Sequence, residues 1–202
     1  IIPTILLLGL LVYSLPFMRP RPIAPADLQI AVDGEQFWWR VTYRPAGAAP
    51  VETANEIRIP VGRTVAFRLT AADVVHSFWI PGLAGKMDMI PGRTNALTLT
   101  ATRIGRFRGQ CAEFCGLSHP LMAFEVVVVS TENYAAYLDG LETEARDADT
   151  LQRTRGRDVF IEAGCPACHA IRGVAEGARI GPDLTRVGGR ASLGAGMWAM
   201  NV

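Results

Sequence analysis

Apolar and polar positions alternate with a period of two along the middle of the chain, between residues 28 and 130. The apolar runs are short, and Gly, Pro, Asn and Asp separate them. We interpret eight of these runs as β-strands: "LQIAVDG", "EQFWWRVTY", "EIRIP", "TVAFRLT", "DVVHSFWIP", "NALTLTA", "GRFRGQC" and "LMAFEVVVVS". No long helical period interrupts them. About eight short strands at this spacing predict a mainly β domain, either a sandwich or a barrel, over residues 28–130.

The first 18 residues, "IIPTILLLGLLVYSLPFM", follow another pattern, because they are apolar on all sides and uncharged. A helix needs about 20 apolar residues to cross a membrane. The run also lacks the basic region and cleavage site of a signal peptide. We therefore expect residues 1–18 to form a transmembrane helix whose upstream part is missing. The alternative is a buried core helix.

The remaining segments are more polar. Residues 19–27, "RPRPIAPAD", predict a proline-rich linker. Residues 131–150 predict a helical connector, and residues 151–202 a short, Gly-rich third unit that begins with the helix "LQRTRGRDVFIEAG". We expect this third unit to be incomplete at its end.

The composition of the chain excludes few functions. The chain has 202 residues, half of them hydrophobic, and a formal net charge of +1. This length allows one large or two small domains, and the charge gives no indication of a nucleic-acid partner. The unusual feature is that all four cysteines and two of the three histidines lie in two short segments.

The first segment, "GQCAEFCGLSHPLM" at residues 109–122, holds Cys111, Cys115, His119 and Met122. Thiolate, imidazole and thioether are the ligands of copper in electron-transfer sites. A mononuclear blue-copper site needs one cysteine, whereas two cysteines let two copper ions share both sulfurs. Each copper then needs one nitrogen, and His76 is the free histidine that can supply the second. A disulfide or a zinc site is the alternative, but neither uses the methionine.

Together with "HSFWIPGLAGKMDMIPGR" at 76–93, this segment resembles the CuA domain of cytochrome c oxidase subunit II. The resemblance implies a cupredoxin-like Greek-key β-barrel that holds a binuclear copper centre. It implies that the two cysteines bridge the coppers, that His76, His119 and Met122 are terminal ligands, and that a backbone carbonyl completes one copper. The implied copper ligands are His76, Cys111, the backbone carbonyl of Glu113, Cys115, His119 and Met122. The side chain of Glu113 is expected to reach a magnesium site shared with subunit I.

The same family carries an aromatic run before the copper ligands, which here is Gln36-Phe37-Trp38-Trp39. The tryptophan through which electrons enter in the family aligns with Phe37, so this chain departs from the pattern. Trp38 and Trp39 are the other candidates for electron entry. Alternatively, these aromatic residues fill the core of the β domain.

The second segment, "CPACH" at 165–169, has the spacing of covalent haem c attachment. Cys165 and Cys168 would form thioethers, and His169 would be the proximal iron ligand. The rival is a thioredoxin-like redox pair, which needs a βαβ setting that the flanking sequence lacks.

The surrounding sequence, with "IGPDL" at 180–184, resembles class I cytochrome c. This resemblance implies a small all-α unit in which the carbonyl of Pro182 accepts a hydrogen bond from the haem-ligating histidine. The distal ligand stays open among Met197, Met200 and a residue beyond Val202.

The two centres together use every histidine and cysteine of the chain. The sequence therefore resembles subunit II of a haem-copper cytochrome c oxidase with a fused cytochrome c domain. This implies electron flow from cytochrome c or a membrane cytochrome, through haem c and CuA, to haem a of subunit I, where oxygen reduction is coupled to proton pumping. The implied partners are subunits I and III and membrane lipid.

The resemblance also implies a place in the bacterial inner membrane, with both centres on the periplasmic side. Arg19 and Arg21 alone would favour a cytoplasmic side for the residues after the helix. The alternatives are a nitrous oxide reductase-like protein, a copper-free quinol oxidase subunit and a non-catalytic copper and haem carrier.

Overall fold

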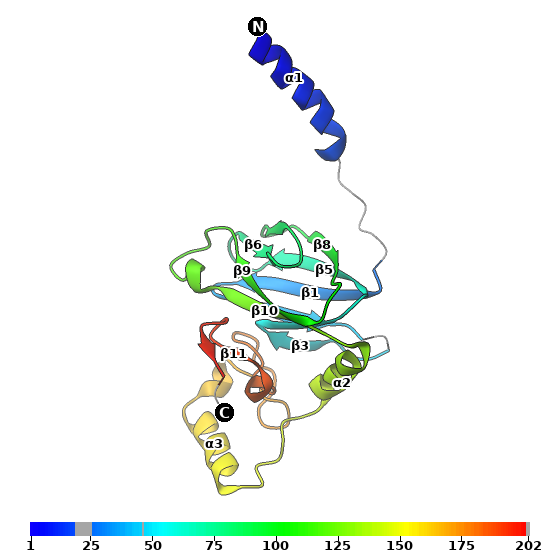
Figure 1. Cartoon of the computed structure of the whole chain (residues 1–202). Coiled ribbons are helices and arrows are strands. Elements are labelled where there is room, and N and C mark those ends of the chain that lie inside the picture. Colours follow the sequence, from blue (N-terminus) through cyan, green and yellow to red (C-terminus); the bar gives the residue numbers. More distant parts are fainter. Residues whose placement is uncertain (19–25, 46, 201–202) are drawn as a thin grey trace.

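The computed structural model describes residues 1–18, 26–45 and 47–200. Two five-stranded sheets pack face to face in the middle of the chain (Figure 1). The first has the order β3-β2-β1-β5-β8, with β1 Leu28–Glu35, β2 Trp38–Tyr43, β3 Val51–Ala54, β5 Thr64–Ala71 and β8 Asn95–Thr100. The second has the order β4-β10-β9-β6-β7, with β4 Glu56–Pro60, β6 His76–Trp79, β7 Lys86–Met89, β9 Gly105–Cys111 and β10 Ala123–Val129. This arrangement confirms the predicted mainly β domain.

Two strands in this domain were not predicted. Strands β3 and β7 have only four residues each, and two of the four residues of β7, "KMDM", are polar. β7 nevertheless pairs along its whole length with β6, and Met89 at its end is fully buried. Period-two alternation is too short in such strands to be detected, so pairing with a neighbour decides their conformation.

Aromatic side chains from both sheets meet in the core. Phe78 on β6 stacks on Phe124 of β10 with ring centroids 4.6 Å apart, and Trp39 of β2 lies 5.0 Å from Phe124. All three are fully buried. Such pairs contribute about 0.5–1.5 kcal/mol beyond the apolar area that they bury. Because Trp39 belongs to the first sheet and the two phenylalanines to the second, these contacts join the two sheets.

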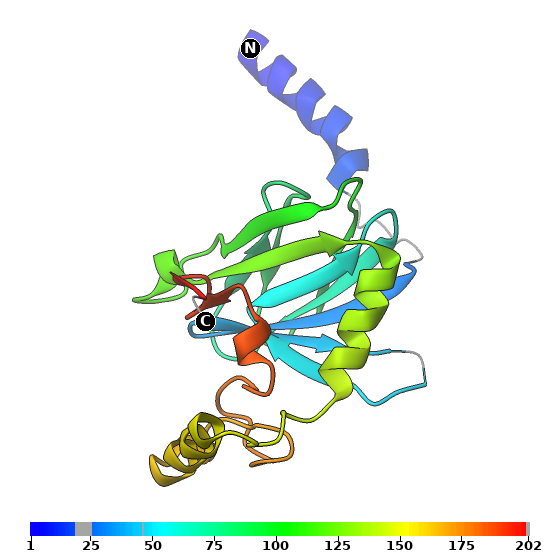
Figure 2. The same ribbon diagram turned by 60° about the horizontal axis from the view of Figure 1, so that its bottom comes forward.

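Helix α2, Thr131–Glu142, follows β10 and packs beside β3 and β4 (Figures 1 and 2). The side chain of Ser130 caps it by accepting a hydrogen bond from the backbone N–H of Asn133 at 3.2 Å. Tyr134 and Leu141 are its buried residues. The predicted helical connector is thus one helix whose inner face extends the β-domain core, followed by a segment without regular secondary structure up to Thr150.

The last unit contains helix α3 Leu151–Glu162, the 3₁₀ turns η3 Cys165–Ala167 and η4 Val187–Gly189, and a hairpin of β11 Ser192–Leu193 and β12 Trp198–Ala199. The prediction of an all-α unit is therefore wrong for residues 192–199. The turn between the two short strands is Gly194-Ala195-Gly196, and all three residues have positive φ. Two glycines make this left-handed turn accessible, and it folds the chain back on itself.

At the start of the chain, α1 Ile2–Ser14 continues into the 3₁₀ turn η1 Leu15–Met18, and none of its residues is buried. Within the described ranges, no helix has both the length and the apolar character needed to cross a membrane. The predicted linker at 19–27 falls almost wholly outside the described residues.

A close contact in the core gives a test of the fold. Gly109 on β9 faces the ring of Phe124, and a methyl group added at Gly109 would overlap that ring. We expect Gly109→Ala to lower the free energy of unfolding by about 1–3 kcal/mol, because the buried ring has no space into which to move. Urea unfolding measures this. Gly85→Ala is the control, since nothing lies within 4 Å of the added carbon, and an equal loss in both variants would contradict the prediction.

Candidate metal centre

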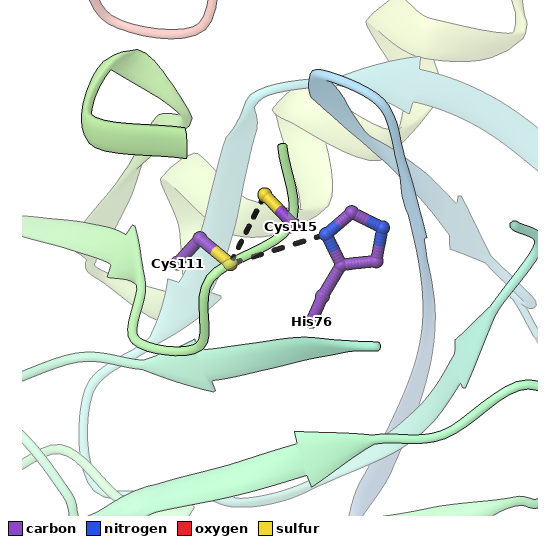
Figure 3. A group of neighbouring side chains, drawn as sticks. All are labelled: His76, Cys111 and Cys115. Atoms are coloured by element: carbon purple, nitrogen blue, oxygen red, sulfur yellow. Dashed lines mark hydrogen bonds between the residues drawn. The ribbon is translucent and has the colours of Figure 1, made fainter. Parts of the chain in front are cut away.

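The candidate centre lies where β6 begins and β9 ends. These strands are antiparallel neighbours, with Phe78 opposite Cys111, so the first residue of β6 and the last residue of β9 lie at the same end of the sheet. Burial alternates along β9 and turns Cys111 inward. His76 is fully buried at the start of β6. The loop after β9 then brings Cys115 back beside both residues (Figure 3).

The sulfur and nitrogen atoms of these three residues are close enough to bind metal together. Cys111 Sγ is 3.8 Å from Cys115 Sγ and 3.9 Å from His76 Nδ1. All three ligand atoms lie within 4.8 Å of one another, and all three residues are buried. A disulfide would need about 2.05 Å between the sulfurs. Both cysteines are free, and the geometry is that of converging metal ligands.

The other predicted copper ligands complete the ring of donors around the two sulfurs. His119 Nδ1 lies 3.6 Å and Met122 Sδ 3.7 Å from Cys115 Sγ, while the carbonyl oxygen of Glu113 lies 3.2 Å from Cys111 Sγ. Met122 is 1% exposed. The structure therefore brings together all six residues that the sequence pointed to. Glu113 is exposed.

A second layer of residues, which sequence reasoning missed, orients these ligands. Asp73 Oδ1 lies 2.8 Å from His76 Nε2, and the Asp73 carboxylate also accepts backbone N–H bonds from Gln36 and Val74. Because Nε2–H donates to the carboxylate, the ring is held with Nδ1 facing Cys111. The Gln36 side chain donates from Nε2 to the carbonyl of Cys115 at 2.5 Å.

Glycine is required beside His76. A carbon added at Gly34 of β1 would lie 2.8 Å from the His76 ring, so the strand can pass the imidazole only without a side chain. The signal in the sequence was weak. Asp73 lies three residues before a predicted ligand, and Gln36 sits in the aromatic run, but neither position identifies its partner.

The two thiols titrate differently because they share one site. Burial raises the pKa of Cys111, but the hydrogen bond from His76 and backbone N–H groups outweigh it, and the pKa falls to about 6. Burial and the neighbouring Cys111 thiolate raise the pKa of Cys115 to about 12. One negative charge is therefore stable in the metal-free site. The second thiolate requires added positive charge, which a bound metal ion supplies.

The three candidates for electron entry have different surroundings. Trp39 is fully buried in the core, where it cannot contact an external donor. Trp38 is half-buried beneath the Arg40 guanidinium, 4.6 Å from its ring centroid. Phe37 is half-buried against Gly116, next to Cys115. Electron entry through Phe37 or Trp38 stays a prediction.

The second cysteine cluster forms a tight turn after α3. Gly164 adopts a left-handed φ of 74°, and the backbone N–H of His169 donates to the carbonyl of Cys165 at 3.0 Å. His169 Nδ1 donates to the carbonyl oxygen of Pro182 at 2.8 Å. This bond leaves Nε2 as a lone-pair donor, which is the tautomer that binds iron. Met197 is 39% exposed and lies beside the hairpin turn.

The residues around this turn fit a covalently held haem. Cys165 and Cys168 are free thiols, with Cys168 exposed. Gly181 lies against the His169 ring, and its lack of a side chain leaves room for the imidazole. Apolar side chains in the same unit are open to solvent, with Val159 53%, Trp198 66% and Ile180 73% exposed. A flat apolar group would remove such surface from water.

Three comparisons with known proteins find the same family. Residues 40–130 match the sequence model of the family described as cytochrome c oxidase subunit II, periplasmic domain. Cytochrome c oxidase subunit 2 of Alkalihalophilus pseudofirmus is 40% identical over 197 residues, which cover 94% of this chain and 56% of that protein. The Bacillus subtilis protein of the same name is 32% identical over 212 residues, which cover 96% of this chain and 59% of that protein. The chain thus spans little more than half the length of these curated relatives.

A solved structure is similar to the β domain. The periplasmic domain of subunit II of cytochrome oxidase of Bradyrhizobium japonicum has a TM-score of 0.56 and 30% sequence identity, covering 60% of this chain and 97% of that chain. The predicted cupredoxin-like fold is confirmed by this likeness.

The unequal thiols give a test that needs no metal. In the copper-free chain carrying Cys165→Ser and Cys168→Ser, ultraviolet absorbance should show one thiolate forming with a midpoint near pH 6. His76→Gln removes the imidazole beside Cys111 and should move this midpoint upward, toward the ordinary thiol value of about 8.5. His119→Gln is the matched control and should move it less. Two thiolates that form together near the ordinary value would refute unequal pKa values.

Proposed function

This chain belongs to the cytochrome c oxidase subunit II family, and from that premise we propose that it passes single electrons from a c-type cytochrome to subunit I of a haem-copper oxidase. The observation that supports this most directly is the pair of free, buried thiols 3.8 Å apart, with one imidazole nitrogen beside each. This donor set matches two copper ions that share both sulfurs. Reduction of oxygen and proton pumping would take place in subunit I.

Copper bound here would supply a centre that gains and loses one electron. Cys111, Cys115, His76, His119, Met122 and the Glu113 carbonyl would hold the copper. The chain's own contribution is to keep these ligands still. His76 is held by Asp73, and the carbonyl of Cys115 by Gln36. Ligands that do not move between oxidation states keep the energetic cost of electron transfer small.

We propose that electrons reach this centre through a haem attached at Cys165 and Cys168, with His169 as the proximal ligand and Pro182 fixing its ring. The free thiols, the bond from His169 to Pro182 and the exposed apolar surface of this unit support the proposal. The 94% coverage of this chain by its Alkalihalophilus relative extends the likeness well beyond the β domain. The distal ligand would come from Met197, Met200 or a residue beyond Val202.

We propose further that α1 is part of a membrane anchor and that both centres lie on the periplasmic side of the bacterial inner membrane. The uniformly apolar sequence of α1 and its lack of buried residues support this. The similar Bradyrhizobium structure is named as a periplasmic domain, which supports a periplasmic position for both centres. Subunits I and III and membrane lipid would be the partners, and Glu113 would contribute to a magnesium site at the contact with subunit I.

Spectroscopy of the purified complex tests the copper assignment. Electron paramagnetic resonance should show a mixed-valence binuclear copper signal, and visible spectra a c-type haem band. Cys111→Ser or Cys115→Ser should remove the binuclear signal and leave the haem band, because the two clusters are separate sites. A mononuclear copper signal in the unaltered complex would refute the assignment. Purification of the chain with both cofactors but no haem-copper partner would favour a non-catalytic electron carrier.

The haem assignment has a test of its own. A carbon added at Gly181 would lie 2.6 Å from the His169 ring, so Gly181→Val should displace the imidazole while both cysteines stay intact. We expect covalently bound haem with a visible spectrum of altered iron ligation. Gly188→Val is the control, because nothing lies within 4 Å of the added carbon. Absence of covalent haem from the unaltered chain would contradict the assignment.

A further inference from the structure

The backbone N–H of Ala123, directly after the predicted copper ligand Met122, lies on the side of β10 that faces β4. Along β10, alternate N–H groups point to the same side, and that of Glu125 donates to the carbonyl of Asn55 beside β4 at 2.9 Å. β4 pairs with β10 only from Glu125 onward. Ala123 therefore needs an acceptor that neither sheet supplies.

The turn of the C-terminal hairpin supplies this acceptor. Ala195, between β11 and β12, accepts the Ala123 N–H bond at 3.1 Å and is only 4% exposed. Gly196 comes so close that an added carbon would lie 3.3 Å from the Ala123 side chain. Its carbonyl also accepts a 3.3 Å bond from the exposed Arg108 of β9. The red end of the chain lies beside the start of β10 in Figures 1 and 2.

The entry to the hairpin is fixed at a second point. Glu56, the first residue of β4, is 4% exposed, and its Oε2 accepts the backbone N–H of Ala191 at 2.9 Å. Its other oxygen is paired with Arg58 at 2.9 Å. The hairpin is thus bound to the two neighbouring strands β4 and β10. A charge-assisted bond to a buried carboxylate is stronger than a neutral one.

The bond at Ala123 bears directly on Met122. The Met122 carbonyl accepts the backbone N–H of Cys111 at 2.9 Å, and its peptide bond to Ala123 carries the N–H that Ala195 accepts. The carbonyl of that peptide is therefore bonded to Cys111, and its N–H is bonded to the hairpin. The position of the Met122 thioether, 3.7 Å from Cys115 Sγ, depends on both bonds.

We propose that residues 191–196 act as a clasp that positions Met122 in the copper centre, with Ala195 and Gly196 as its positioning residues. In copper electron-transfer sites a methionine ligand tunes the reduction potential, and Met122 would be that ligand here. Docking of the C-terminal unit would therefore set the potential of the copper centre as well as bring the two units together. This inference rests on the proposed copper centre for its effect on potential, but not for the hydrogen bond at Ala123.

The test is Gly196→Val in the full chain, loaded with copper(II). The added side chain should push the turn away from Ala123. We expect exchange of the Ala123 amide hydrogen about tenfold faster than in the parent, together with a shifted copper reduction potential. Gly177→Val is the matched control. Gly177 also has a positive φ, in the same unit, but nothing lies within 4 Å of an added carbon, so both readouts should equal those of the parent.

The outcomes separate this inference from the proposed function. Faster exchange with an unshifted potential, or no change in either, overturns the clasp and leaves the copper assignment intact. If the parent forms no binuclear copper centre, the proposed function fails, and exchange at Ala123 in the copper-free chain still decides whether the hairpin holds β10. If Gly196→Val does not fold, Arg108→Gln removes one exposed contact to the turn and should change both readouts in the same direction, by less.

Discussion

The antiparallel pairing of β6 with β9 is the constraint on which the candidate centre depends. Opposing Phe78 to Cys111 places the start of one strand beside the end of the other, 35 residues apart in sequence. Phe78 of β6 also stacks on Phe124, which keeps this part of β6 in the core. A slip of one residue would turn Cys111 to the opposite face, so the centre can form only if β9 keeps this register.

The predictable part of the centre is the part with local spacing. Cys111, at the end of β9, is followed in the next loop by Cys115, His119 and Met122, so their ligand types and intervals are visible in sequence. Counting histidines led to His76. Asp73 and Gln36 have no such pattern, because their roles come from strands that meet only in the folded chain. For the same reason β3 and β7 were missed, while longer alternating strands such as β10 were found.

The C-terminal unit shows where local reasoning gives an incomplete picture. The attachment pattern at 165–169 and the partner Pro182 follow from sequence, and the structure places His169 and Pro182 in contact. Nothing in the sequence shows that Arg40 of β2 donates to the carbonyl of Arg179 at 2.8 Å, or that Glu56 accepts the backbone N–H of Ala191 at 2.9 Å. These contacts join residues more than 130 positions apart, and only the packing of the two units creates them.

A unit bound at several points differs physically from one on a loose tether. A flexible linker raises the effective concentration of a donor to about millimolar, and each electron transfer then waits for a docking event. Here Arg40, Glu56 and Ala123 already hold backbone atoms of residues 179, 191 and 195. Part of the entropy of docking is therefore lost on folding rather than at each transfer. The separation between the proposed centres would then be fixed, because contacts with the β domain that positions the ligands also set the relative position of the two units.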